Sequence, residues 1–346
     1  MKSAPYRRQL RRYWPLLTCL LVPTIAPAQD SGTAARGVLK GGAPHAAPDW
    51  FKESFLEFQE DAAEAGEADK HLMLFFQLNA CPYCDRMLGE SFEADPNMSY
   101  MQRHFDVIAV NVKGDREIVF NEEITVLEKE LAEILQVRAT PAIVFLDAEN
   151  QSVARVNGYR APPRFRKVLE YVSTKAYRKT TLASYMARNL TADVYELRDN
   201  PLFKPLKDLS GIDGPLLVIL ENASCYDCVE FHDRLLTHAD VKKELERFTV
   251  VRLDTDSAET IVDVSGNETT AGALAEHYAM SFRPGVLIFD AGELVRRYDS
   301  LLFSFHFKEG LRYISGGHYK NGDYRSYSQS RREALLAQGV DINLAD

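Results

Sequence analysis

Short apolar runs, separated by stretches with helical periodicity, recur twice along the chain in the same order. Residues 72–76 and 216–220 are continuous apolar runs, a pattern typical of strands that are buried on both faces. After each run come a helical stretch, a second strand-like run, a second helical stretch, and a third strand that directly follows a proline. A last strand and a helix complete both copies. The pattern predicts an α/β unit with a central sheet, present twice.

The two copies also share individual residues. Seven residues between positions 165 and 185 recur 142 positions later. They are Phe165, Leu169, Tyr171, Ser173, Tyr177, Ser184 and Tyr185, matched by Phe307, Leu311, Tyr313, Ser315, Tyr319, Ser326 and Tyr327. Self-similarity at a fixed spacing indicates duplicated structural units. We therefore predict two domains, a first repeat over residues 49–190 and a second repeat over residues 191–346, with a short helix near the C-terminus.

The first 28 residues have the layout of a secretory signal peptide. Five basic residues and no acidic residue precede a mainly apolar run over residues 14–25, and Ala26-Pro27-Ala28 fits a cleavage site. The apolar run is short for a membrane span, and a signal anchor is the alternative interpretation. We predict export to the periplasm with cleavage near Ala28, followed by a flexible leader over residues 29–48, which are rich in Gly, Ala and Pro.

Charge excludes several classes of partner. Because the first 28 residues carry five basic and no acidic residues, their removal changes the formal net charge from −9 to −14. An acidic surface argues against nucleic acid and anionic lipid as partners. No phosphate-binding glycine loop, serine triad or carboxylate constellation stands out, so we predict no small-molecule cofactor.

Cleavage would leave four cysteines: Cys81, Cys84, Cys225 and Cys228. Disulfides persist outside the cytosol, but a bridge over two intervening residues removes little unfolded-state entropy. The spacing therefore favours redox exchange over structural cross-linking. The histidines lack metal-ligand spacing, so we predict no metal site. Zinc shared by both pairs remains an alternative that would require the two pairs to face one another.

The segments around the first pair carry a family resemblance. They are Ala80-Cys-Pro-Tyr-Cys84, Asn111-Val-Lys-Gly-Asp-Arg116 and Val137-Arg-Ala-Thr-Pro141. With them the first repeat resembles the SoxW-type periplasmic thioredoxins, and the second repeat resembles the thioredoxin fold more loosely. The resemblance implies α/β architecture with two tandem thioredoxin-like domains, each a central mixed sheet flanked by helices. It also implies that Pro141 and Pro284 are cis and face the cysteine pairs, so that Thr140 and Arg283 would border the substrate.

The residues of the first pair suit thiol–disulfide exchange. A helix N-terminus favours the thiolate of a cysteine placed there. Cys81 follows a strand and a short turn, and Pro82 fits the first helical position, where its missing N–H is not needed. We expect Cys81 to attack and Cys84 to resolve the mixed disulfide, with Pro82 and Tyr83 at the substrate surface. A static local disulfide is the alternative.

The second pair departs from this pattern. Asp227, next to Cys228, opposes thiolate formation, and Arg283 could offset that effect if it points toward the sulfur atoms. Cys225 and Cys228 are therefore predicted to be catalytic or to relay electrons, with a structural disulfide as the alternative.

Two further departures concern both repeats. Thioredoxins carry a buried acid six residues before the first cysteine, where this chain has Phe75 and Ile219. The distance from cysteine to proline is also longer than in compact relatives. We place the extra residues at 114–125 and 257–270, as loops that contact partners or as extra length without a role.

The sequence predicts a periplasmic thiol–disulfide oxidoreductase, a protein-disulfide reductase or electron carrier. Its substrates would be disulfide-containing proteins, and the family resemblance implies a membrane thiol transporter as electron donor. A disulfide isomerase or oxidase is the alternative within the same chemistry, because dipeptides between the cysteines decide the direction of electron flow poorly. A partner-binding module with a redox-silent second repeat is the alternative of another class.

Overall fold

A computed structural model describes residues 35–42, 46–190 and 194–345 of the chain. The predicted signal peptide and its cleavage site lie outside these residues. Among the residues described, no helix combines the length and apolar character needed to cross a bilayer.

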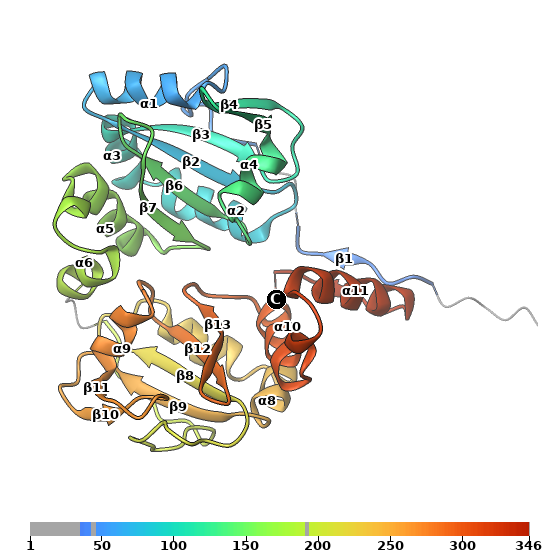
Figure 1. The fold of residues 1–346 in the computed structure, drawn as a ribbon. Helices are drawn as coiled ribbons and strands as arrows, with labels where there is room; N and C mark the ends of the chain where they lie inside the picture. Colours follow the sequence, from blue (N-terminus) through green and yellow to red (C-terminus); the bar gives the residue numbers. More distant parts are fainter. Residues whose placement is uncertain (1–34, 43–45, 191–193, 346) are drawn as a thin grey trace, which may run out of the picture. The chain divides into compact units, whose positions relative to one another are not determined.

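The first repeat is built on a four-stranded mixed sheet with the order β3-β2-β6-β7 (Figure 1, blue to green). Strand β2 pairs in parallel with β3 and antiparallel with β6, and β6 pairs antiparallel with β7. The strands are β2 (His71–Gln77), β3 (Phe105–Asn111), β6 (Ala142–Leu146) and β7 (Ser152–Asn157). The helical segments are α1 (Phe58–Glu67), α2 (Pro82–Met87), the π-helical turn η1 (Leu88–Phe92), α3 (Asn97–His104), α4 (Glu128–Ile134), α5 (Pro162–Ser173), the 3₁₀ turn η2 (Ala176–Arg178) and α6 (Leu182–Asn189).

The second repeat has a second four-stranded sheet whose order, β13-β12-β8-β9, follows the same pattern (Figure 1, yellow to orange). Here β8 pairs in parallel with β9 and antiparallel with β12. The strands are β8 (Leu216–Glu221), β9 (Thr249–Asp254), β12 (Gly285–Asp290) and β13 (Glu293–Tyr298). The helical segments are α7 (Cys228–Glu230), η3 (Phe231–Leu235), α8 (Ala239–Leu245), α9 (Ala271–His277), α10 (Ser304–Ser315), η4 (His318–Lys320) and α11 (Tyr324–Ala337).

The central strand of each sheet is buried on both faces, as its continuous apolar run predicts. In β2, Met73 and Phe75 belong to one apolar cluster, whereas Leu72, Leu74 and Phe76 belong to a second cluster. Successive side chains of a strand point to opposite faces, so one strand contributes to two cores. Strand β8 divides its side chains in the same way. The predicted fold class is confirmed: α/β, with two mixed sheets flanked by helices.

The extra residues between cysteine and proline form hairpins rather than irregular loops. In the first repeat they form β4 (Glu117–Asn121) and β5 (Ile124–Leu127), and in the second β10 (Thr260–Val262) and β11 (Glu268–Thr270), each pair antiparallel. The buried carboxylate of Glu128 fixes the base of the first hairpin. It accepts hydrogen bonds from the backbone N–H groups of Asn111, at 2.9 Å, and Arg116, at 3.3 Å, and from the Arg116 guanidinium at 2.6 Å.

A short pairing of distant segments was not predicted. β1 (Leu39–Lys40), within the predicted leader, pairs in parallel with β14 (Ile342–Asn343). The C-terminal helix α11, Tyr324–Ala337, is also longer than the short helix that the sequence predicted near the C-terminus. The predicted domain boundaries stay predictions, and the one between residues 190 and 191 adjoins residues that the structure does not describe.

We expect Glu128→Ala to lower the free energy of unfolding of the protein by about 1–3 kcal/mol, because the N–H groups of Asn111 and Arg116 lose a buried acceptor. Urea unfolding followed by circular dichroism measures the change. Glu122→Ala, at the exposed turn of the same hairpin, is the matched control. Equal unfolding midpoints for the two variants would show that Glu128 does not hold the hairpin.

Candidate functional sites

The first cysteine pair is a disulfide at the start of α2. Cys81 and Cys84 are bonded, with 5.2 Å between their Cα atoms. Cys81 caps the helix: the backbone N–H of Cys84 donates to Cys81 Sγ at 3.2 Å. Pro82 is at the first turn, where its fixed φ suits a helix. The predicted strand–turn–helix setting of Cys81 is therefore present, and an N–H group points at the sulfur expected to react.

Residues far apart in sequence meet at this disulfide. The Thr140–Pro141 peptide is cis, as expected, and the Thr140 hydroxyl lies 3.3 Å from Cys81 Sγ. Phe75, in place of the buried acid of thioredoxins, belongs to the apolar cluster that contains both cysteines. The structure thus brings Cys81, Cys84, Thr140 and Pro141 together.

Tyr83 has a different setting from the one expected. It is buried; its hydroxyl accepts a hydrogen bond from the backbone N–H of Phe303, and the two rings lie 4.1 Å apart between centroids. Phe303 belongs to the same apolar cluster as Cys81 and Cys84. Tyr83 therefore contacts a residue of the second repeat, not solvent.

The second pair is also a disulfide but occupies a different local structure. Cys225 and Cys228 are bonded, with 5.4 Å between their Cα atoms, and neither side chain is exposed. Helix α7 begins only at Cys228, with Asp227 at its N-cap, so Cys225 lies in the turn before the helix. A proline presets helical φ after Cys81, whereas Tyr226 after Cys225 does not, which accounts for the later start.

Arg283 precedes a cis proline, Pro284, as expected, but does not offset Asp227 in the way the sequence suggested. Its hydrogen bonds to described residues go to the Thr255 hydroxyl and to the carbonyls of Met280 and Phe282. Burial lowers the pKa of Arg283 to about 10.

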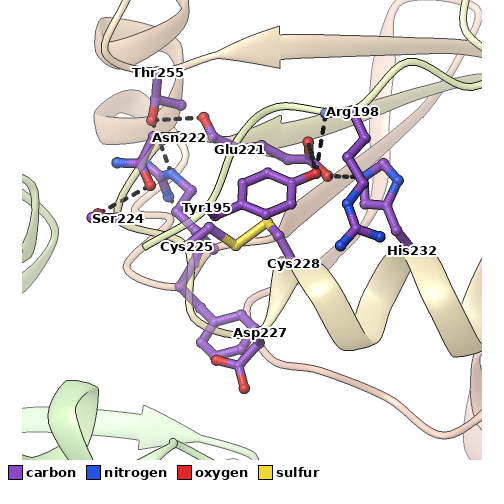
Figure 2. Close-up of a disulfide and its surroundings, with 12 residues drawn as sticks. Tyr195, Arg198, Glu221, Asn222, Ser224, Cys225, Asp227, Cys228, His232 and Thr255 are labelled. Carbon is purple, nitrogen blue, oxygen red and sulfur yellow. Dashed lines mark hydrogen bonds and ion pairs between the residues drawn. A yellow bond between two sulfur atoms is a disulfide. The ribbon is translucent and has the colours of Figure 1, made fainter. Parts of the chain in front are cut away.

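Among the described residues, the cation that pairs with Asp227 is Arg164, in the first turn of α5 of the first repeat. Its Nε lies 3.9 Å from Asp227 Oδ2, and both side chains are buried. Burial raises the pKa of Asp227 to about 6, with the Arg164 guanidinium acting in the opposite direction. Figure 2 shows the Asp227 carboxylate pointing away from the two sulfur atoms. Asp227 thus interacts with the first repeat rather than opposing a thiolate at close range.

A polar cluster beside the second disulfide was missed. Glu221, the last residue of β8, is fully buried; its Oε1 lies 2.8 Å from His232 Nε2, and its Oε2 accepts a hydrogen bond from the Tyr195 hydroxyl at 3.3 Å (Figure 2). The one sequence signal was the charge that directly ends the apolar run at 216–220. Nothing in the local sequence marks Tyr195 or Arg164, because their partners are distant in the chain.

Both repeats contribute to a set of charged contacts. Arg86, in the helix after the first pair, makes two hydrogen bonds to Glu230, in the helix after the second pair, at 3.1 and 3.0 Å. Arg160 donates to the backbone carbonyl and the carboxylate of Asp299. Among the described residues, no group of three or more His, Cys, Asp and Glu side chains lies close enough to hold a metal ion.

Comparison with known proteins supports the fold of the first repeat. Residues 58–173 match the family model for a thioredoxin-like domain, so the first repeat contains such a domain. No curated protein matches the chain.

Solved structures of thioredoxin-fold proteins match about one third of the chain each. A thioredoxin-fold protein from Helicobacter pylori is 27% identical, with a TM-score of 0.30, over 37% of this chain and 86% of its own. A thioredoxin from Thermus thermophilus is 28% identical, with a TM-score of 0.28, over 34% of this chain and 85% of its own. The oxidised C-terminal domain of DsbD from Neisseria meningitidis is 15% identical, with a TM-score of 0.25, over 34% of this chain and 88% of its own.

Asp227 should make stability depend on pH. Its pKa is about 6 in the folded protein and near 3.8 when unfolded, so the folded state binds the proton more tightly. This contribution to stability is therefore complete below about pH 4 and is lost as the pH rises through 6, a change on the order of 2–3 kcal/mol. Urea unfolding at pH 4 and pH 7 should show that loss in the unaltered protein and a smaller one in Asp227→Asn. Equal pH dependence in both proteins would contradict the assignment.

Proposed function

We propose that this protein is a periplasmic thiol–disulfide oxidoreductase in which Cys81 and Cys84 carry the reaction. The observation that supports this most is the setting of Cys81. It caps α2, receives the Cys84 N–H at 3.2 Å, and lies 3.3 Å from the Thr140 hydroxyl beside cis Pro141. Both groups can donate hydrogen bonds to a thiolate once the disulfide is reduced, and hydrogen bonding to the charged form favours it.

The reaction follows from this arrangement. In the reduced protein, the Cys81 thiolate attacks one sulfur of a substrate disulfide and releases the other as a thiolate, which takes up a proton. Cys84, deprotonated in turn, attacks Cys81 Sγ and releases the second substrate thiol. Two electrons pass to the substrate, and the Cys81–Cys84 disulfide of this structure is the oxidised product. Cys84 is completely buried, so it reacts only with its neighbour.

The proposal extends to location and partners. The signal-peptide layout of residues 1–28 supports export, and the resemblance to SoxW-type thioredoxins supports disulfide-containing proteins as substrates and a membrane thiol transporter as electron donor. Thr140, Pro141, Pro82 and Tyr83 are proposed to border the substrate at the first site, and Arg283 and Pro284 at the second. Because Phe303 covers Tyr83 in this structure, access of a substrate to Tyr83 requires this contact to open.

A second candidate role applies to the second repeat alone. Cys225 and Cys228 are fully buried in the oxidised state, which favours a docking or structural role over direct exchange with proteins. Catalysis by the first pair does not depend on which role is correct.

Single cysteine variants test the assignment. With dithiothreitol as electron donor and insulin as substrate, Cys81→Ser should fall to the background rate, because the remaining thiol of the pair, Cys84, is buried and out of reach of the substrate. When the variant is first reduced and freed of dithiothreitol, Cys84→Ser should accumulate a mixed disulfide between Cys81 and insulin, visible by mass spectrometry under non-reducing conditions. The control Cys225→Ser/Cys228→Ser should keep its rate within about twofold, because dithiothreitol reduces the Cys81–Cys84 disulfide directly and does not need the second pair. Undiminished activity of Cys81→Ser would overturn the proposal.

The direction of electron flow is tested by equilibration with glutathione. A reductase requires a potential for the Cys81–Cys84 pair near that of thioredoxin, about −270 mV, whereas an oxidase lies near about −120 mV. A reduction potential near the oxidising value would show that the protein acts as an oxidase rather than a reductase. The assignment of Cys81 as the nucleophile would not change.

A further inference from the structure

The two disulfides differ in what covers them. Cys81 remains 5% exposed, whereas both sulfur-bearing side chains of the second pair are 0% exposed. Cys225 and Cys228 form a small apolar cluster with Tyr195, and Leu197 packs against it. Tyr195 is not part of the second sheet or its helices. It belongs to the segment that precedes them, residues 194–198, which we call the linker segment.

The backbone of the linker segment is attached to the loop that carries Cys225. The N–H groups of Val194 and Tyr195 both donate to the carbonyl of Ala223, at 2.9 and 3.0 Å. These bonds place the linker segment directly beside the loop. The Tyr195 ring then lies against the disulfide, as Figure 2 shows.

The phenol end of Tyr195 is fixed by a second attachment. Its hydroxyl donates to Glu221, and Glu221 is itself held by His232, which follows Cys228 by one helical turn. The backbone carbonyl of Glu221 also accepts from the N–H of Thr255 at 2.8 Å. Burial raises the pKa of Tyr195 to about 12, so the hydroxyl keeps its proton at neutral pH and acts as the donor. Glu221 is thus bonded through both its side chain and its backbone, and in sequence Glu221 and His232 lie on either side of the redox pair.

Beyond Tyr195, its bonds to Ala223 and Glu221, and the packing of Leu197, the linker segment is held mainly by contacts near the surface. Val194 is exposed, and the ion pair of Arg198 with Asp233 lies at the surface, where such pairs contribute little. A segment with few buried contacts opens locally at a smaller free-energy cost than the sheet beneath it. Displacement of Tyr195 can thus expose the disulfide while the second repeat stays folded.

We infer that Tyr195 is a lid on the Cys225–Cys228 disulfide, and that it must move before a thiolate can reach Cys225. This inference rests on the proposed thiol–disulfide chemistry, applied to the second pair. With the lid open, an incoming thiolate from a dithiol attacks Cys225 Sγ, and the sulfur of Cys228 leaves as a thiolate that takes up a proton. The second thiol of the reductant then breaks the mixed disulfide, which leaves Cys225 and Cys228 reduced and the reductant oxidised.

The test measures reduction of the second disulfide directly, in the full chain with Cys81→Ser/Cys84→Ser. Dithiothreitol is the reductant, and free thiols are trapped with a maleimide–polyethylene glycol that shifts the band on a gel. Tyr195→Ala should be reduced at least about tenfold faster than the parent, because attack by a thiolate depends on access to the sulfur. Leu206→Ala changes an exposed residue between the linker segment and β8 that is not part of the apolar cluster around the disulfide, and it should match the parent.

A second variant separates the ring from the hydroxyl. Tyr195→Phe keeps the ring and loses the hydrogen bond to Glu221. A reduction rate between those of the parent and Tyr195→Ala supports a lid held in place by both the ring and the hydroxyl. Equal rates for Tyr195→Ala and the parent overturn the inference.

Urea distinguishes a lid from a loss of folding. If reduction of Tyr195→Ala is unchanged by urea well below the unfolding midpoint, the disulfide is reached in the folded protein, as expected once the lid is removed. A rate that rises with urea in parallel with global unfolding overturns the lid. Neither outcome depends on Cys81, so failure of the lid and failure of the proposed function are distinguished.

Discussion

The structure depends on one constraint: the central strand of each sheet must be buried on both faces. Strands β2 and β8 send alternate side chains into two apolar clusters each, so each must have apolar side chains at nearly every position. Their polar ends are therefore where the chain can first turn and present reactive groups. Both cysteine pairs follow a few residues after these strands, and the cis prolines Pro141 and Pro284 directly precede the strands β6 and β12 that pair with them.

The two sites are built on the same scaffold but differ at a few single positions. Pro82 starts the helix immediately after Cys81, and Cys81 thereby becomes its cap. Tyr226 occupies the matching place after Cys225, and the helix starts later, at Cys228. Glu221 ends the second central strand with a buried acid that holds a tyrosine over the sulfur atoms. The first site therefore has the features of a reactive pair, and the second those of a protected pair.

The sequence could predict those features that depend on neighbouring residues or that occur in both repeats. The strands follow from apolar runs, the cysteine sites from spacing and turn residues, and the doubling from identities at one separation. The sequence did not predict residues whose role depends on distant partners. Arg164 is 63 positions from Asp227, and Tyr195 is 26 positions from Glu221. The position of Arg283 was predicted, but its hydrogen-bond partners were not, because several carbonyls compete for a guanidinium and only packing decides among them.

The pairing of β1 with β14 joins residues 39 and 342, which are 303 positions apart. The strands are parallel, so the chain enters β1 at one end of the pair and leaves β14 at the other. Tension applied between the two ends of the protein would therefore load this pair in shear, with its hydrogen bonds strained together rather than one after another. Until the pair ruptures, the force bypasses both sheets and both disulfides. This two-residue pairing would therefore be the part that breaks first under such tension, before either sheet or either disulfide carries the load.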